Sequence, residues 1–377
     1  MGFDAPTFGF NEPTLTIVAY LGYLFAFLFF CAHLMTRSGR ALFAPRTQVT
    51  LAGATAGASA GGSMDLDFEG QTEGSQRGVS YSPVLGRIGS GLVLFAWLSL
   101  ATALGLRWAH AGHPPYVTLY EIATMLVFGI TTVYLVLFEG VLKTRSVGAF
   151  VVLLIFCLHS YAVWFIPTDL KRTIELVPAL RSNWLLIHVS MAIISYSAFA
   201  TAAGAGLTFL AKHYMKGRIA AALPSGAAIE EFMYRAVAVG FPFVTLVLIT
   251  GAIWAQEAWT KAWSWDPKEV WALITWLTYA AYLHVRVQRG VRNVTMAWLS
   301  LIGFAVVLFT FMGVNYLVEW FGLQSMHTYS IDSGKPPGLS AASIGTVLVF
   351  VALLLVAFVS WLRVKFPGRR APKAPGK

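Results

Sequence analysis

Charged side chains and cysteines are both scarce in this chain of 377 residues. Asp, Glu, Lys and Arg make up 12% of it, about half the fraction that soluble domains carry. The two cysteines, Cys31 and Cys157, stand apart in apolar segments. Nothing therefore indicates a Cys-x-x-Cys dithiol or a thiolate metal site, and we expect both cysteines to be small buried residues. Glycine-rich phosphate loops and Ser-His-Asp orderings are not evident either, which argues against nucleotide-driven transport by this chain alone.

Long apolar runs are what the sequence has instead. Hydrophobic residues make up 57% of the chain, and an apolar run of about 20 residues is long enough to cross a bilayer as a helix. We therefore expect an all-α integral membrane protein, a polytopic bundle of about nine transmembrane helices. The predicted spans are 14–36, 88–107, 118–140, 147–166, 185–211, 236–256, 268–286, 296–317 and 342–363. No short cleavable signal pattern precedes the first span, so we expect it to stay.

The basic residues indicate how the chain crosses the membrane. Most of the 27 Lys and Arg residues fall in the loops and the tail that share one side with the C-terminus, and such residues favour the cytoplasmic side. The sequence thus predicts an N-out, C-in topology, and the net charge of +10 needs no nucleic-acid partner to explain it. We divide the chain into three parts: the first helix with a flexible cytoplasmic loop (1–87), a transmembrane core (88–330), and an additional helix with a basic cytoplasmic tail (331–377).

Tryptophans cluster in the predicted external segment 254–271, WAQEAWTKAWSWDPKEVW. It contains Trp254, Trp259, Trp263, Trp265 and Trp271. An ordinary aromatic belt spreads its tryptophans over many helix ends. The clustering favours a flat aromatic platform for a large planar hydrophobic ligand, which buries area and stacks on such rings.

The Asp-Pro-Lys-Glu turn within this segment predicts a helix start. Asp266 suits the N-cap, Pro267 the first helical position, and Glu269 the reciprocal position of a capping box. This structural role is compatible with a functional one.

Two histidines are candidate ligands of an iron porphyrin, and a third is of interest for its position within a predicted span. His188 and His327 are predicted on the same side as the tryptophans, where neutral imidazoles suit haem iron from its two faces, although a single histidine is more often a hydrogen-bonded interfacial residue. His284 follows Asp266 by 18 residues, which is about 27 Å along a helix and places it near the inner side. An ionisable residue inside a span is a functional hypothesis, and a snorkelling histidine is the alternative.

Taken together, these motifs resemble the haem-handling family named for its Trp-rich WWD signature, in the CcsA (ResC) branch of system II. The resemblance covers about residues 80–330. Its segments are GAIWAQEAWTKAWSWDPKEVWALITW, YAAYLH, GVNYL and MHTYS, with GHPPYVTLYE, LVPALRSNWLLIHVSMAIISYSAF and YRAVAVGFP upstream. Thr260 and Ala262 depart from the pattern, which has glycine and an aromatic residue there.

The resemblance implies that haem b, as a transported substrate, crosses the membrane and is presented for thioether attachment to the CXXCH motif of apocytochrome c. It implies haem contacts for the external site residues Trp254, Trp259, Trp263, Trp265 and Asp266. His188 and His327 are implied as axial ligands there, and His284 as a ligand of an inner haem that shares it with a histidine of a separate CcsB (ResB) partner. Lys261 and Lys268 are hypothetical propionate partners, with solvated surface residues as the alternative.

The same resemblance predicts a bacterial plasma membrane or a thylakoid membrane, with the WWD segment on the periplasmic, extracellular or lumenal side. The resemblance makes the chain a subunit of a holocytochrome c synthase complex. The chain offers no outward thiol for the thioether chemistry, so whether this subunit is itself an enzyme is left open. Two other functions remain at this point: a transporter of another hydrophobic planar solute, and a haem-bearing subunit of a respiratory complex.

Overall fold

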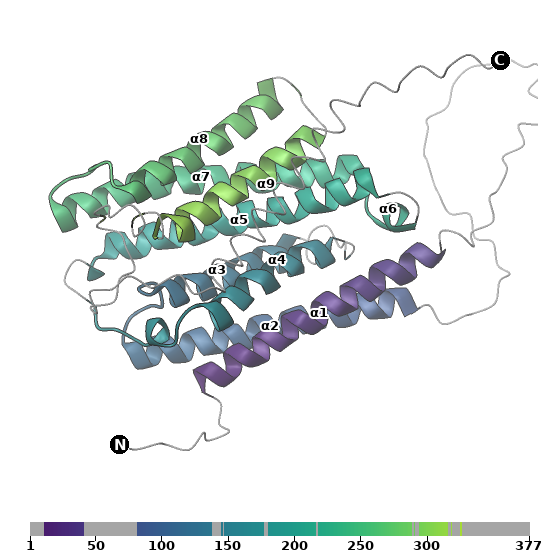
Figure 1. Cartoon of the computed structure of the whole chain (residues 1–377), viewed down its shortest axis with the longest axis horizontal. Helices are drawn as coiled ribbons and strands as arrows, with labels where there is room; N and C mark the ends of the chain where they lie inside the picture. The colour runs from purple at the N-terminus through teal and green to yellow at the C-terminus, as the bar shows by residue number, and fades with distance from the viewer. Residues whose placement is uncertain are drawn as a thin grey trace, which may run out of the picture.

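The computed structural model of the protein describes residues 11–40, 81–137, 145, 147–176, 180–215, 218–288, 290, 294–315, 318 and 325. Within these ranges every regular element is helical (Figure 1), which confirms the predicted all-α fold. The helices are α1 (Glu12–Arg40), α2 (Tyr81–Ala111), α3 (Leu119–Tyr134), α4 (Gly148–Ser160), α5 (Asn183–Tyr214), α6 (Arg218–Ala222), α7 (Gly226–Trp259), α8 (Pro267–Gln288) and α9 (Val294–Leu308). The π-turns η2 (Tyr161–Phe165) and η5 (Phe309–Gly313) extend α4 and α9, and η3 (Asp169–Lys171) is a short 3-10 turn.

Seven of the described helical segments are long and apolar enough to cross a membrane, so the chain is a polytopic membrane protein. They are α1, α2, α3, α4 with η2, α5, α7, and α9 with η5. The predicted span 268–286 forms α8, which is long but carries charged residues at both ends, such as Lys268 and Arg286. The predicted span 342–363 lies outside the described residues.

The helices form one elongated bundle. Along it, α1 packs against α2 at one side, α3 and α4 lie in the middle, and α5, α7, α8 and α9 lie together at the other side (Figure 1). The start of α1 and the connection between α7 and α8 lie at the same end of the bundle, and α6 lies at the opposite end (Figure 1). We call these the outer end and the inner end, after the predicted topology.

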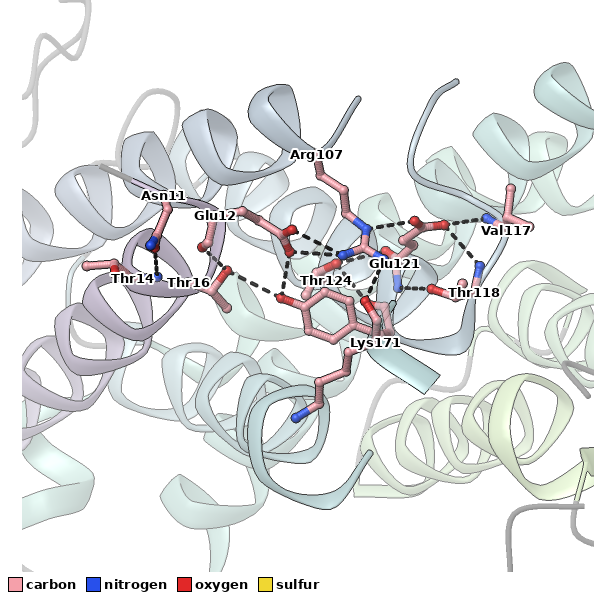
Figure 2. A network of polar contacts seen from close by, with 11 residues as sticks. Asn11, Glu12, Thr14, Thr16, Arg107, Val117, Thr118, Glu121, Thr124 and Lys171 are labelled. Atoms are coloured by element: carbon pink, nitrogen blue, oxygen red, sulfur yellow. Dashed lines mark hydrogen bonds and ion pairs between the residues drawn. The ribbon is translucent and has the colours of Figure 1, made fainter. Parts of the chain in front are cut away.

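A buried ion network closes the outer end of α1, α2 and α3 (Figure 2). Arg107 donates from Nε to Glu121 at 2.6 Å and from Nη1 to Glu12 at 3.1 Å, and its Nη2 donates to the carbonyl of Lys171 at 2.8 Å. Glu121 is fully buried and also completes the capping box of α3 with Thr118. Every charge in this network therefore has a close partner, as a buried ion pair requires.

The two cysteines do not share one environment. Cys31 is half-buried in α1, whereas Cys157 is exposed on α4. The expectation that both are buried is therefore wrong for Cys157, because residue 157 lies on the outward face of its helix. A small apolar side chain on the surface of a membrane helix meets lipid rather than water, and lipid does not penalise it.

Candidate functional site

The turn before α8 is built as the sequence predicts. The backbone N–H of Lys268 donates to Asp266 Oδ1 at 2.9 Å, and the backbone N–H of Asp266 donates to Glu269 Oε2 at 3.1 Å. Asp266 is buried. Glu269 Oε2 also accepts from the backbone N–H of Ser264 at 2.8 Å. The Asp266–Glu269 capping box therefore ties the tryptophan-rich loop to the first turn of α8.

Two residues of this loop have left-handed backbone conformations. Thr260, which ends α7, has a φ of 61°, and Trp265 has a φ of 59°. Glycine adopts this region without penalty, whereas a β-branched residue there is strained. Thr260 therefore carries the strain of a conformation that glycine would adopt freely.

The tryptophans meet in two perpendicular pairs. Trp254 and Trp259 have ring centroids 6.0 Å apart and an interplanar angle of 73°, and Trp263 and Trp265 are 5.8 Å apart at 88°. Trp254 is buried and Trp265 is 72% exposed. Edge-to-face contact is a favourable arrangement of aromatic rings. The two rings of each pair are thus nearly perpendicular and do not form one flat surface.

A small pocket of about 130 Å³ lies beside this loop. Its walls come from α3, α5, α7, the loop, α8 and η5, and they include His188, Trp254, Trp263 and Lys268. Sites for cofactors and other small molecules have volumes of about 300–1,000 Å³ and mostly apolar walls with a few polar groups. The pocket has this kind of lining, but its volume lies below that range.

His188 is held rigidly in the pocket wall. Its Nδ1 lies 3.0 Å from the carbonyl oxygen of Val247. A carbonyl only accepts hydrogen bonds, so Nδ1 carries the proton and Nε2 of the neutral ring bears the lone pair. The imidazole is nearly parallel to Trp254, at 21° and 6.3 Å between centroids. It also lies against Gly251, where a Cβ atom would come within 2.9 Å of Nδ1.

The two candidate lysines lie in different places. Lys268 is half-buried and lines the pocket, where its amino group joins the polar side chains of His188 and Glu269. Lys261 is exposed and does not line the pocket. The structure therefore separates them, and Lys268 alone of the two lines the site.

The remaining sequence-predicted residues lie elsewhere. Trp259 and Trp265 contact the pocket tryptophans edge-on, while the side chain of Asp266 caps α8. His284 is exposed on the inner half of α8 and does not line the pocket. His327 lies outside the described residues. In the part of the chain that the structure describes, no three His, Cys, Asp or Glu side chains form a metal cluster.

Several pocket residues were not predicted from the sequence. Ile122 and Leu126 of α3, Tyr196 of α5 and Phe311 of η5 complete the walls. The segment GVNYL, noted for the family resemblance, begins at Gly313, the last residue of η5. The α3 residues carry no local signal, because only packing brings them to a loop more than a hundred residues away.

Comparison with known proteins is consistent with this site. The family model described as cytochrome C assembly protein matches residues 116–321. A cytochrome c biogenesis protein CcsA of Guillardia theta is 36% identical over 260 residues, which are 63% of this chain and 85% of the relative. One of Microcystis aeruginosa is 35% identical over 292 residues, covering 64% and 88%. The matched region contains α3 to η5 and with them the whole pocket. This chain belongs to the cytochrome c assembly protein family.

Proposed function

We propose that this member of a cytochrome c biogenesis family moves haem b across the membrane and holds it in the outer pocket. From there it presents the haem for covalent attachment to the CXXCH motif of apocytochrome c. The chain positions haem and acceptor, and the cysteine chemistry belongs to the acceptor.

The observation that carries this proposal is the setting of His188. Its proton is fixed on Nδ1 by the carbonyl of Val247, 3.0 Å away, and its ring lies in the wall of the pocket. Metal-binding histidines commonly donate their other ring nitrogen to a backbone carbonyl in this way, which sets the tautomer and the ring orientation. His188 is thus prepared to bind iron through Nε2.

The other walls suit the rest of a haem molecule. Trp254 and Trp263 offer apolar ring surface, and Lys268 offers a cation to a propionate. We propose His327 as the second axial ligand, because a second imidazole saturates the iron and discourages oxygen chemistry. The imidazole of the acceptor then displaces one of the two during transfer.

The inner haem site is proposed at His284. This residue lies on α8 about 27 Å from its start by helix geometry, and its side chain is exposed. We propose that a histidine of a CcsB (ResB) partner completes the iron ligation there. An exposed histidine on a membrane helix fits a ligand that a second chain shares.

The test is haem spectroscopy on the protein purified with its partner. We expect His188→Ala to lower haem at the outer site by about tenfold or more, because loss of even an outer-shell partner of a metal ligand lowers affinity by about 10–100-fold. The double variant His188→Ala/His327→Ala should lose outer haem while inner haem persists. His284→Ala should lower total haem, because the inner site supplies the outer one.

Matched controls are exposed histidines at each end. His110 lies at the outer end of α2 and His213 at the inner end of α5, and both are exposed. Replacing either with Ala should leave the spectrum unchanged. An unchanged spectrum and full cytochrome maturation in the double variant would show that the outer ligands are assigned wrongly.

A further inference from the structure

Helix α8 turns a polar face to the protein interior. Its buried residues are Thr275, Tyr279, Tyr282 and Arg286, whereas Leu277 is 52% exposed. Spacings of four, three and four residues place the buried side chains on one face of the helix. A helix of a soluble protein turns its apolar face inward. Here the buried face carries a polar stripe from Thr275, in the middle of α8, to Arg286 near its inner end.

The outer end of this polar stripe opens into the pocket. The hydroxyls of Thr275 and Thr310 lie 2.8 Å apart, and Thr310 lines the pocket. Tyr196 also lines the pocket. The contact between Thr275 and Thr310 connects the pocket wall with the buried face of α8.

The middle of the stripe contains hydroxyls that lack hydrogen-bond partners among the described residues. The hydroxyls of Tyr279 and Tyr282 are buried in this way, and so is that of Ser300 on the neighbouring α9, three residues before Gly303, which packs against Tyr279. Tyr279 is held by its ring, which stacks on Phe199 with centroids 3.4 Å apart and lies against Gly303. A buried hydroxyl without a partner is costly, and proteins commonly satisfy such groups with internal water.

The inner end of the stripe is an ion cluster that reaches the surface. Arg286 lies 3.3 Å from Glu230 and 3.4 Å from Glu231, with its guanidinium 5.3 Å from the ring centre of Tyr234. Arg286 and Glu230 are buried, whereas the side chain of Glu231 is 42% exposed. Tyr282 lies one helical turn before Arg286 on the same buried face of α8. Glu231 therefore connects the buried stripe with the inner surface.

We propose that the buried face of α8 binds a file of water molecules and conducts protons between Glu230 and Glu231 at the inner end and the outer pocket. Each hydroxyl of Tyr279, Tyr282 and Ser300 donates one hydrogen bond and accepts another. When one oxygen of the file accepts a proton, it passes another proton to the next oxygen. Every side chain therefore ends in its original protonation state. Other titratable groups along the path are Tyr196 and Tyr234, with Arg286 as the fixed positive charge.

This path gives the outer pocket access to protons from the inner side. A group in the pocket that gains or loses charge can then be neutralised without opening the pocket to the outer solution. For the haem that we propose there, this consequence rests on the proposed function. The water file itself does not depend on haem.

The first test detects bound water directly in the purified full chain. X-ray radiolysis generates hydroxyl radicals from water, and the radicals modify side chains that touch it. We expect Tyr279 and Tyr282 to be modified. Tyr23 is the matched control, because it is equally buried but its hydroxyl lies 3.0 Å from that of Thr131. If Tyr279 and Tyr282 are protected to the same degree as Tyr23, the water file does not exist.

The second test measures proton flux into liposomes that contain the full chain and a pH-sensitive dye, without added haem. Tyr279→Phe and Tyr282→Phe keep the ring and remove only the hydroxyl. Each should slow the flux by about tenfold, equivalent to about 1.4 kcal/mol in barrier height, whereas Tyr23→Phe should not. Fluxes that are equal in all four proteins would overturn the proposal. Because neither readout uses haem, failure here leaves the haem assignment standing, and failure of the haem spectra leaves this path standing.

Discussion

Two buried arginines, one at each end of the bundle, are each set between two glutamates, yet their surroundings differ. Arg107 lies 2.6 Å from Glu121 and 3.1 Å from Glu12 (Figure 2), whereas Arg286 lies 3.3 Å and 3.4 Å from its two carboxylates. The first cluster has short, directed hydrogen bonds and a helix cap. The second has longer contacts and leads into a row of buried hydroxyls. Similar residue types thus fasten three helices at the outer end and leave a looser polar cluster at the inner end.

The largest expected effect comes from breaking the outer cluster. Arg107→Ala leaves the buried carboxylate of Glu121 without its guanidinium, and breaking a buried ion pair in this way costs about 3–5 kcal/mol. We expect a large fall in the unfolding temperature of the protein in detergent. Arg235→Ala is the control, because Arg235 is exposed and its pair with Glu231 is of the kind that contributes about 0.3–0.5 kcal/mol. Equal losses in the two variants would show that the outer cluster does not fasten the helices.

The inner cluster should tolerate change better. Glu230→Gln keeps the size of the side chain and leaves Arg286 its contact with Glu231. We expect a loss of about 1–3 kcal/mol, the cost of leaving a buried polar group less well paired, measured by the same thermal unfolding. A loss as large as that of Arg107→Ala would mean that the inner cluster is as tightly built as the outer one.

The smallest expected effect comes from relieving the backbone strain of Thr260 at the outer end of the bundle. A side chain in the left-handed conformation costs about 1–2 kcal/mol, and Thr260→Gly removes this cost from the folded state. Glycine also gives the unfolded chain more conformational freedom, which destabilises the fold by about 0.5–1 kcal/mol. The net gain in stability should therefore be about 0.5–1 kcal/mol. Ala262→Gly is the control and should lower stability, because Ala262 is not among the left-handed residues. A loss at both positions would mean that Thr260 is not strained.

The fold was largely predictable because its signals are local. Apolar runs predicted the spans, and Asp266 to Glu269 predicted the start of α8 with its cap. The bounds were less accurate. The span predicted at 236–256 is part of α7, Gly226–Trp259, because hydropathy rejects Glu230 and Arg235 although both pair with other charges. Hydropathy counts a charge in the same way whether or not a distant residue neutralises it.

The site was predictable only in part, for the opposite reason. His188 and the tryptophans stood out as rare residue types on one predicted side, and the structure brings His188, Trp254 and Trp263 into one pocket. The walls contributed by Ile122, Tyr196 and Phe311 are ordinary apolar or aromatic residues of membrane helices. Their role comes from helix packing, which the order of residues along the chain does not reveal.

Because Gly251 packs against His188, the angle of the imidazole can be changed without removing the imidazole itself. A methyl group at position 251 would come within 2.9 Å of the imidazole, so alanine there obliges the ring to tilt without deleting it. The glycine thus acts as a spacer that sets the angle of the imidazole. At the outer site that we propose, exchanging that one hydrogen atom for a methyl group offers a way to change the angle of the imidazole while His188 itself stays in place.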